Sequence, residues 1–185
     1  GNYGINERDF ESRRVQVAGF AVREHSTRPS HSMSTATLDE FLASQGVAGI
    51  EGIDTRAVTR RLRTSGVMMG AITLDPSPQS VLTRLREFPS YADTDFVKSV
   101  TTEQHYEWSQ LAHGQDAAAI TRKIVAIDCG LKYNILRILR SKGCEVVAVP
   151  ASASVQEITA LGPDGVVMSP GPGDPELLDY AVDTA

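Results

Sequence analysis

The sequence of 185 residues contains only 2 cysteines, Cys129 and Cys144. Two thiols cannot form the dense disulfide framework that stabilises small secreted domains, so the sequence does not belong to that class. The 4 histidines are scattered along the chain, without a pair at i and i+4 and without carboxylates at metal-ligand spacing. We therefore expect no metal site, and we interpret the histidines as surface residues.

An excess of positive charge and long apolar runs are also missing. The 18 Lys and Arg residues against 23 Asp and Glu residues leave a net charge of −5, which argues against non-specific binding to nucleic acid or to an anionic membrane. No apolar run is long enough to cross a bilayer, and the start, GNYGINERDF, lacks the features of a signal peptide. We expect a cytoplasmic protein whose partners are neutral molecules or other proteins.

Hydrophobic residues make up 41% of the sequence, enough for one medium domain or two small ones with their own cores. In the first half, Val15–Arg23 mixes β-branched residues with an approximate alternation, which predicts a strand. Thr37 and Glu40 form a capping-box pattern, which predicts a helix from about Leu38 to Gln45.

Further helices and a strand are expected before residue 90. Asp54 is the candidate N-cap of a helix that ends at Gly66, and Val67–Leu74 is then predicted to be a strand. Pro78 opens another helical stretch, which Pro89 ends. From about residue 90 to residue 121 the periodicity is lost, so we expect an extended connector that lies against a surface.

From Lys123 onward the pattern becomes an alternation of strands and helices. The apolar runs are Ile124–Asp128, Glu145–Val149 and Gly165–Met168, separated by the helical segments Asn134–Ser141 and Ser154–Ala160. Runs with little alternation are typical of strands buried on both faces of a parallel sheet. The sequence thus predicts an amino-terminal mixed α/β domain over residues 1–110, a linker over 111–122, and the opening of an α/β domain over 123–185.

A turn rich in glycine and proline, Ser169–Pro175 (SPGPGDP), directly follows the last of these runs. In an open α/β sheet small molecules bind outside the carboxyl ends of the strands. Glycine permits a close approach to a ligand, whereas proline removes amides and fixes φ, so the few remaining N–H groups can be aimed at one acceptor. The arrangement suits an oxyanion, and a plain tight turn is the alternative.

Two segments of the second half, DGVVMSPGPGDP and VAIDCGLKYNILRILRSKGCEVVAVP, resemble the class I glutamine amidotransferases. In the first half, NYGINERDFES, GIEGIDTRAVTRRLRTSGVMMGAI and FVKSVTTEQHYEW resemble the amino-terminal domain attached only to the small subunits of carbamoyl-phosphate synthetase. The resemblance to that family covers nearly the whole chain. One departure is Ser30–Met33, where many members of the family have a Ser-Asn-Trp-Arg-like stretch.

The resemblance implies a flavodoxin-like second domain and hydrolysis of glutamine to glutamate and ammonia. It further implies that the ammonia passes through a tunnel to a large subunit, which uses bicarbonate, ATP and Mg to make carbamoyl phosphate for arginine and pyrimidine synthesis. This chain itself is expected to hold no cofactor. By position in the motif, Gly171 is expected to supply an oxyanion-hole amide and Gly173 to contact glutamine.

The catalytic residues of that family have no counterpart in this sequence. The family nucleophile lies in a Gly-x-Cys-x-Gly-x-Gln elbow, a context that neither Cys129 nor Cys144 has, so we expect both thiols to be core or near-core residues. We expect the catalytic Cys, His and Glu beyond Ala185, and the family's opening strands, which contribute a substrate-contacting Ser, ahead of Gly1. The chain is then an internal fragment that is inactive by itself.

Two other hypotheses remain open at this point. The chain would be a non-catalytic docking module for a large synthetase subunit, acting through residues 1–110. Four arginines follow Asp54, namely Arg56, Arg60, Arg61 and Arg63, and those at i, i+4 and i+7 put a cationic edge on one helix. Such an edge suits a phosphate or a partner, although the plainer interpretation is a solvated basic face. A generic nucleotide-binding domain is disfavoured, because CGLK over residues 129–132 replaces the Gly-x-Gly-x-x-Gly turn.

Overall fold

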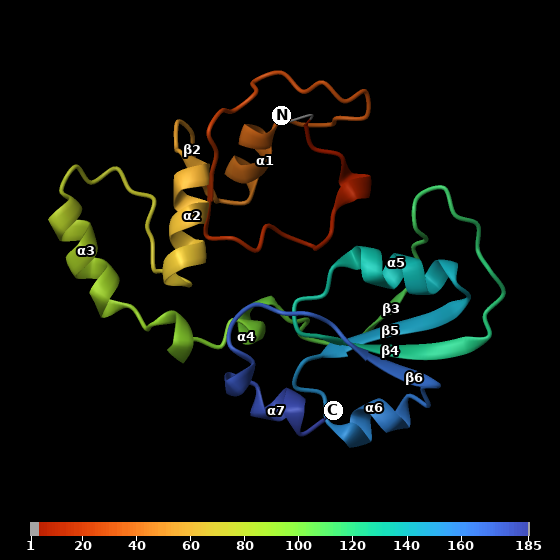
Figure 1. Cartoon of the computed structure of the whole chain (residues 1–185). Helices are drawn as coiled ribbons and strands as arrows, with labels where there is room; N and C mark the ends of the chain where they lie inside the picture. The colour runs from red at the N-terminus through yellow and green to blue at the C-terminus, as the bar shows by residue number, and fades with distance from the viewer. Residues whose placement is uncertain (1–3, 185) are drawn as a thin grey trace. The chain divides into compact units, whose positions relative to one another are not determined.

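The computed structural model describes residues 4–184, and the chain divides into two compact units between Tyr91 and Ala92 (Figure 1). The elements of the first unit are a 3₁₀ turn (Glu7–Asp9), β1 (Gly19–Ala21), α1 (Leu38–Ser44), β2 (Ala48–Ile50), α2 (Thr55–Ser65) and α3 (Pro78–Glu87). Strands β1 and β2 pair in parallel. A further 3₁₀ turn, Tyr91–Asp93, lies at the division.

The three helices of the first unit begin at the predicted signals. Before α1, the Thr37 hydroxyl accepts a hydrogen bond from the Glu40 amide, and the Glu40 carboxylate accepts one from the Thr37 amide at 2.8 Å. Before α2, the Asp54 carboxylate accepts a hydrogen bond from the Ala57 amide at 3.0 Å. Pro78 occupies the first turn of α3. These amides have no partner within the helix, so a local cap decides where each helix starts.

Two strand predictions for the first unit need correction. The strand predicted over Val67–Leu74 is wrong, since none of these residues is paired in a sheet. Of the longer strand predicted over Val15–Arg23, only β1 is formed. Over residues 4–91 the described sheet consists of β1 and β2, so Val67–Leu74 has no neighbouring strand to satisfy its backbone groups, and an apolar pattern alone does not make a strand.

The second unit is built on a four-stranded sheet. Its strands are β3 (Tyr106–Trp108), β4 (Arg122–Asp128), β5 (Cys144–Pro150) and β6 (Gly165–Met168), in the order β3-β5-β4-β6. Strand β4 pairs in parallel with β5 and β6, and β3 is antiparallel to β5. The helices are α4 (Val97–Val100), α5 (Tyr133–Ser141), α6 (Val155–Ala160) and α7 (Asp179–Val182), with a 3₁₀ turn at Pro175–Leu177. The predicted α/β class is confirmed.

Two hydrophobic clusters cover opposite faces of this sheet, because successive strand residues point to alternate sides. One cluster joins β4 and β5 to α4 and α6 through Val125, Ile127, Val147, Val149, Val97 and Ile158. The other joins the same strands to α5 through Ala126, Val146, Ala148 and Leu136. Figure 1 shows α5 on one side of the sheet and α6 on the other. The helices α5 and α6 thereby fix the strands whose carboxyl ends are considered below.

Burial on both faces is confirmed for β4 and β5 but is wrong for β6. The side chains of Val166 and Met168 are 50% and 43% exposed. Among the described residues β6 has one strand neighbour, β4, and a groove of about 270 Å³ lies beside it, lined by residues of β6 and α6. An apolar run therefore marks a strand without deciding how many of its sides are covered.

Residues 92–110 pack with the second unit, whereas the sequence placed them with the first. The reason is the pairing of β3 with β5, which sets Tyr106 opposite Ala148 and Trp108 opposite Val146. Val97 of α4 is also fully buried in the cluster against β4 and β5. The domain boundary near residue 110, which the sequence predicts, stays a prediction. In residues 4–184 every helix is too short or too polar to cross a bilayer.

Candidate oxyanion site at the carboxyl ends of β4 and β6

The turn Ser169–Gly173 leaves β6 beside the turn that follows β4. The two strands are parallel, with Ile127 opposite Met168, so their carboxyl ends lie side by side (Figure 1). The Ser169 amide donates a hydrogen bond to the Ile127 carbonyl oxygen at 3.0 Å, and the Cys129 amide donates one to Ser169 Oγ at 3.0 Å. The predicted glycine–proline turn is thus attached to the end of β4 from both directions.

Glycine is required where these turns touch. A side chain at Gly171 would collide with the carbonyl oxygen of Cys129. Gly130 has a φ of 137°, a backbone conformation that residues with a side chain rarely adopt. A Cβ there would lie 3.0 Å from Cδ of Pro172. The contact is backbone against backbone, so Gly171 cannot be replaced without separating the two turns.

The turn presents two unpaired amide donors. Among the described residues neither Gly171 N–H nor Gly173 N–H has a hydrogen-bond partner. Gly171 is exposed and Gly173 is half-buried, while Pro170 and Pro172 have no N–H to offer. Unpaired N–H groups in a fixed backbone at the carboxyl edge of a parallel sheet are what an oxyanion site requires. The roles predicted for Gly171 and Gly173 therefore have suitable geometry, and they stay predictions.

Behind this turn lies Asp128, a residue that the sequence prediction did not single out. Its carboxylate is 7% exposed and accepts hydrogen bonds from the amides of Gly130 at 3.0 Å, Leu131 at 2.7 Å and Thr102 at 2.9 Å. The signal in the sequence was a carboxylate at the end of an apolar strand. A charged group in that place is costly unless its oxygens are paired.

A second contact joins the turn to the segment before β3, beside Gly173. The sequence analysis predicted no site residue there. A Cβ at Gly173 would lie 3.4 Å from Cδ2 of Phe96, and the adjacent Asp95 carboxylate accepts a hydrogen bond from the Tyr180 hydroxyl at 3.0 Å. Burial raises the pKa of Asp95, but hydrogen bonds from Lys98 and Tyr180 outweigh burial, so the pKa lies below its usual range. Burial and the bond to Asp95 raise the pKa of Tyr180 to about 12.

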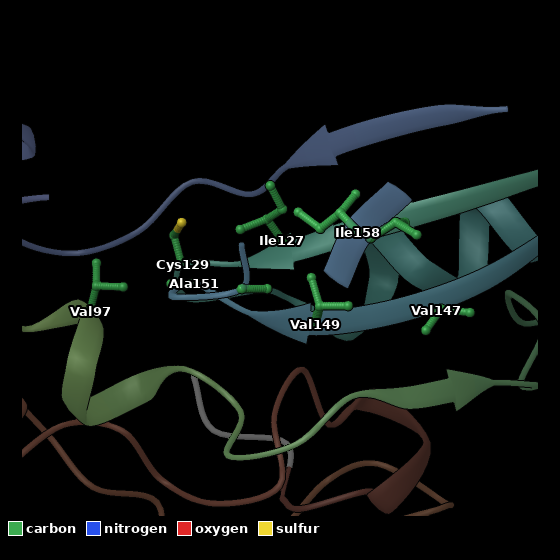
Figure 2. Close-up of a cluster of buried hydrophobic side chains, with 9 residues drawn as sticks. Val97, Ile127, Cys129, Val147, Val149, Ala151 and Ile158 are labelled. Carbon is green, nitrogen blue, oxygen red and sulfur yellow. The ribbon is translucent and has the colours of Figure 1, made fainter. Parts of the chain in front are cut away.

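Neither thiol is placed as a nucleophile. Cys129 is 3% exposed. It belongs to the buried cluster drawn in Figure 2, together with Val97 and Ala151. Burial, and then the charge of Asp128, raise the pKa of the Cys129 thiol, whereas the reactive form is the thiolate. Cys144 starts β5 at the opposite end of the sheet and packs against the α5 cluster. The prediction that both are core or near-core residues is confirmed.

Other candidates from the sequence lie in the first unit. The arginines Arg56, Arg60, Arg61 and Arg63 are exposed on α2, as a solvated face requires. The segment Ser30–Met33 differs from the stretch that many members of the family have. In it, the Met33 amide donates a hydrogen bond to Nδ1 of His31 at 3.2 Å, which forms a local turn. The described part of the chain brings no three His, Cys, Asp or Glu side chains together in a way that could hold a metal ion.

Two family models match this chain. The model for the carbamoyl-phosphate synthase small chain, CPSase domain, matches residues 1–72, and the class-I glutamine amidotransferase model matches residues 125–185. The second match contains the whole glycine–proline turn.

Curated relatives called carbamoyl phosphate synthase small chain match along the whole chain. The protein from Syntrophotalea carbinolica is 44% identical over 98% of this chain and 50% of its own length. The proteins from Polynucleobacter asymbioticus and Solidesulfovibrio magneticus are 42% and 43% identical over 100% of this chain and over 51% and 52% of their own lengths. The chain therefore spans about half the length of the curated relatives it matches.

Proposed function

The chain belongs to the carbamoyl phosphate synthase small chain family, and we propose that it is part of the subunit that hydrolyses glutamine to glutamate and ammonia. The ammonia then passes to a large subunit, which makes carbamoyl phosphate from bicarbonate with ATP and Mg. The two subunits form a cytoplasmic heterodimer that serves arginine and pyrimidine synthesis. The observation that carries the proposal is the fixed turn with unpaired N–H groups at Gly171 and Gly173.

In this proposal the Gly171 amide stabilises the negative charge that develops during hydrolysis. A thiolate attacks the side-chain amide carbon of glutamine, the carbonyl oxygen becomes an oxyanion, and the Gly171 N–H donates to it. Ammonia leaves with a proton from the catalytic histidine, and water hydrolyses the thioester to glutamate. Gly173 contacts the bound glutamine. The nucleophile and its His and Glu come from residues outside this chain, because the Cys129 thiol is buried with a raised pKa and Cys144 lies at the opposite end of the sheet from the turn.

Replacing Gly171 tests this function. The test uses the protein encoded by the whole gene, here called the complete reading-frame product, assembled with its large subunit. In it, Gly171→Ala is expected to lower kcat for glutamine hydrolysis about 100-fold, because the amide donor is displaced by the collision with Cys129. Synthesis from added ammonia should continue unchanged, since it does not use this site. Gly70→Ala is the matched control, because a Cβ at Gly70 would meet no atom within 4 Å. Unchanged glutamine hydrolysis by Gly171→Ala contradicts the proposal.

The second candidate is a non-catalytic docking module for a large synthetase subunit, acting through residues 1–110. The exposed arginines Arg56, Arg60 and Arg63 on α2 favour it, because they offer a cationic edge to an acidic partner surface. The two candidates differ in one measurement on the complete reading-frame product. Binding to the large subunit without any glutamine hydrolysis supports docking alone, and hydrolysis supports the glutaminase.

A further inference from the structure

The buried carboxylate of Asp128 joins segments that are distant in sequence. Its Oδ1 accepts hydrogen bonds from the amides of Gly130 and Leu131, and its Oδ2 accepts one from the amide of Thr102, 26 residues earlier in the chain. Both oxygens are thus occupied by backbone donors. A carboxylate held in this way determines the path of the backbone around it, because moving one donor leaves a buried oxygen without its partner.

The backbone that Asp128 holds is the surface on which the glycine–proline turn rests. Cys129 lies between Asp128 and the two amides of residues 130 and 131, so its peptide groups are fixed by the same hydrogen bonds. The Cys129 amide donates to Ser169 Oγ, and the Cys129 carbonyl oxygen lies against Gly171. Gly130, itself bonded to Asp128, faces Pro172. The contacts that Gly171 and Pro172 make with the turn after β4 therefore come from residues whose positions depend on Asp128, whereas the bond from the Ser169 amide to Ile127 extends the strand pairing.

We propose that Asp128 is a positioning residue for the oxyanion donor Gly171, acting through Cys129. This inference rests on the proposed function of the turn. An amide donor stabilises a developing oxyanion only when it lies within a few tenths of an ångström of the right place, whereas binding of the uncharged amide of glutamine tolerates a looser fit. Loss of the Asp128 carboxylate therefore lowers kcat more than it raises KM.

The test is Asp128→Asn in the complete reading-frame product with its large subunit. Asn has the same shape, but its NH₂ group faces one of the three backbone donors and cannot accept a hydrogen bond. We expect kcat for glutamine hydrolysis to fall by at least about tenfold, with KM changed by less than about threefold. Synthesis from added ammonia should keep its rate.

The matched control is Asp164→Asn. Asp164 also accepts a backbone hydrogen bond, from the Lys123 amide at 2.7 Å, but at the amino-terminal end of the same sheet. We expect this variant to lose thermal stability while kcat stays within about twofold of the wild type. Ser169→Ala, which removes the acceptor of the Cys129 amide, should lower kcat as Asp128→Asn does. In the double variant, kcat should fall by less than the product of the two single fold-decreases, because both changes act through one contact.

Failure of the inference and failure of the proposed function give different results. An active wild type in which Asp128→Asn and Asp164→Asn have equal kcat overturns the positioning role and leaves the function standing. A loss of kcat no larger than the fraction of unfolded protein, measured by circular dichroism, also overturns it. A wild type without glutamine hydrolysis overturns the function. In that case the amide chemical shifts of Gly171 and Gly173 decide the inference, since Asp128→Asn should move them and Asp164→Asn should not.

Discussion

At the scale of single residues, polar groups around the candidate turn are paired across elements. Asp128 accepts hydrogen bonds from the amides of two segments, and Ser169 Oγ accepts one from the Cys129 amide. The Tyr180 hydroxyl donates a hydrogen bond to Asp95. In the sequence, Gly171 and Gly173 could be predicted because glycine and proline carry a local conformational signal. Asp128 and Tyr180 could not, because the role of such a polar group is recognised only when its hydrogen-bond partners in the folded chain are known.

The Tyr180 hydroxyl should give the second unit a dependence on alkaline pH. Its pKa is raised to about 12, above the value of about 10 in an unfolded chain, so the unfolded state loses this proton first. The free energy of unfolding therefore falls as pH rises between about 10 and 12. We expect Tyr180→Phe to cost about 1 kcal/mol at pH 7, through the lost hydrogen bond, and the cost to shrink over that range.

The measurement is urea unfolding of both proteins at steps from pH 7 to pH 12. Since other groups titrate equally in the two proteins, the difference between them isolates the hydroxyl. A difference that stays constant above pH 10 contradicts the shared bond between Tyr180 and Asp95.

At the scale of elements, the capped helices α1, α2, α3 and α6 began where local signals placed them, and one predicted strand did not form. A cap acts within three residues, as in Thr37 with Glu40 and Ser154 with Glu157. A strand needs a partner whose position the sequence pattern does not contain, and Val67–Leu74 has no such partner among the described residues. The starts of the capped helices were therefore predictable from the sequence, and strand pairing was not.

The cap of α6 gives a prediction at this scale. The Ser154 hydroxyl accepts the Glu157 amide at 3.3 Å, and the Glu157 carboxylate accepts the Ser154 amide at 2.7 Å. Ser154→Ala should destabilise the protein by about 1 kcal/mol, because an amide of the first turn loses its acceptor. Gln156→Ala, an exposed change in the same helix, should stay within about 0.5 kcal/mol of the wild type in denaturant unfolding. Equal stabilities of the two variants would mean that the cap contributes nothing.

Acid should weaken the same cap. Hydrogen bonds from the backbone and side chain of Ser154 lower the pKa of Glu157. The contribution of Glu157 to stability is therefore present above its pKa in the unfolded chain and is lost as pH falls through its pKa in the folded protein. The difference between Ser154→Ala and the wild type is therefore smaller in acid than at pH 7.

At the scale of the whole molecule, the division of the chain depends on pairing between distant segments. Residues 92–110 lack periodicity, and the sequence grouped them with the first domain. In the structure β3 pairs with β5, and Val97 is fully buried in the cluster that includes β4, β5 and α6. These contacts attach residues 92–110 to the second unit.

Two truncations test this division. The fragment of residues 92–185 should unfold cooperatively, and the fragment of residues 111–185 should have a lower midpoint temperature by circular dichroism. The shorter fragment loses β3 and the buried side chain of Val97, and removal of a buried aliphatic side chain costs about 2 kcal/mol or more. Equal midpoints would place the boundary nearer residue 110, as the sequence suggested.

By itself the sequence determined the α/β class, the starts of the capped helices, the three apolar strands of the second unit and the turn with Gly171 and Gly173. Each is encoded by residues within one short segment, so the signal is local. Only the tertiary structure decided which strands pair and that Asp128 holds the backbone under the candidate turn. These depend on partners such as Thr102 and Ser169, which lie 26 and 40 residues from the groups they bind. The packing of the folded chain, rather than any local pattern, brings such partners together.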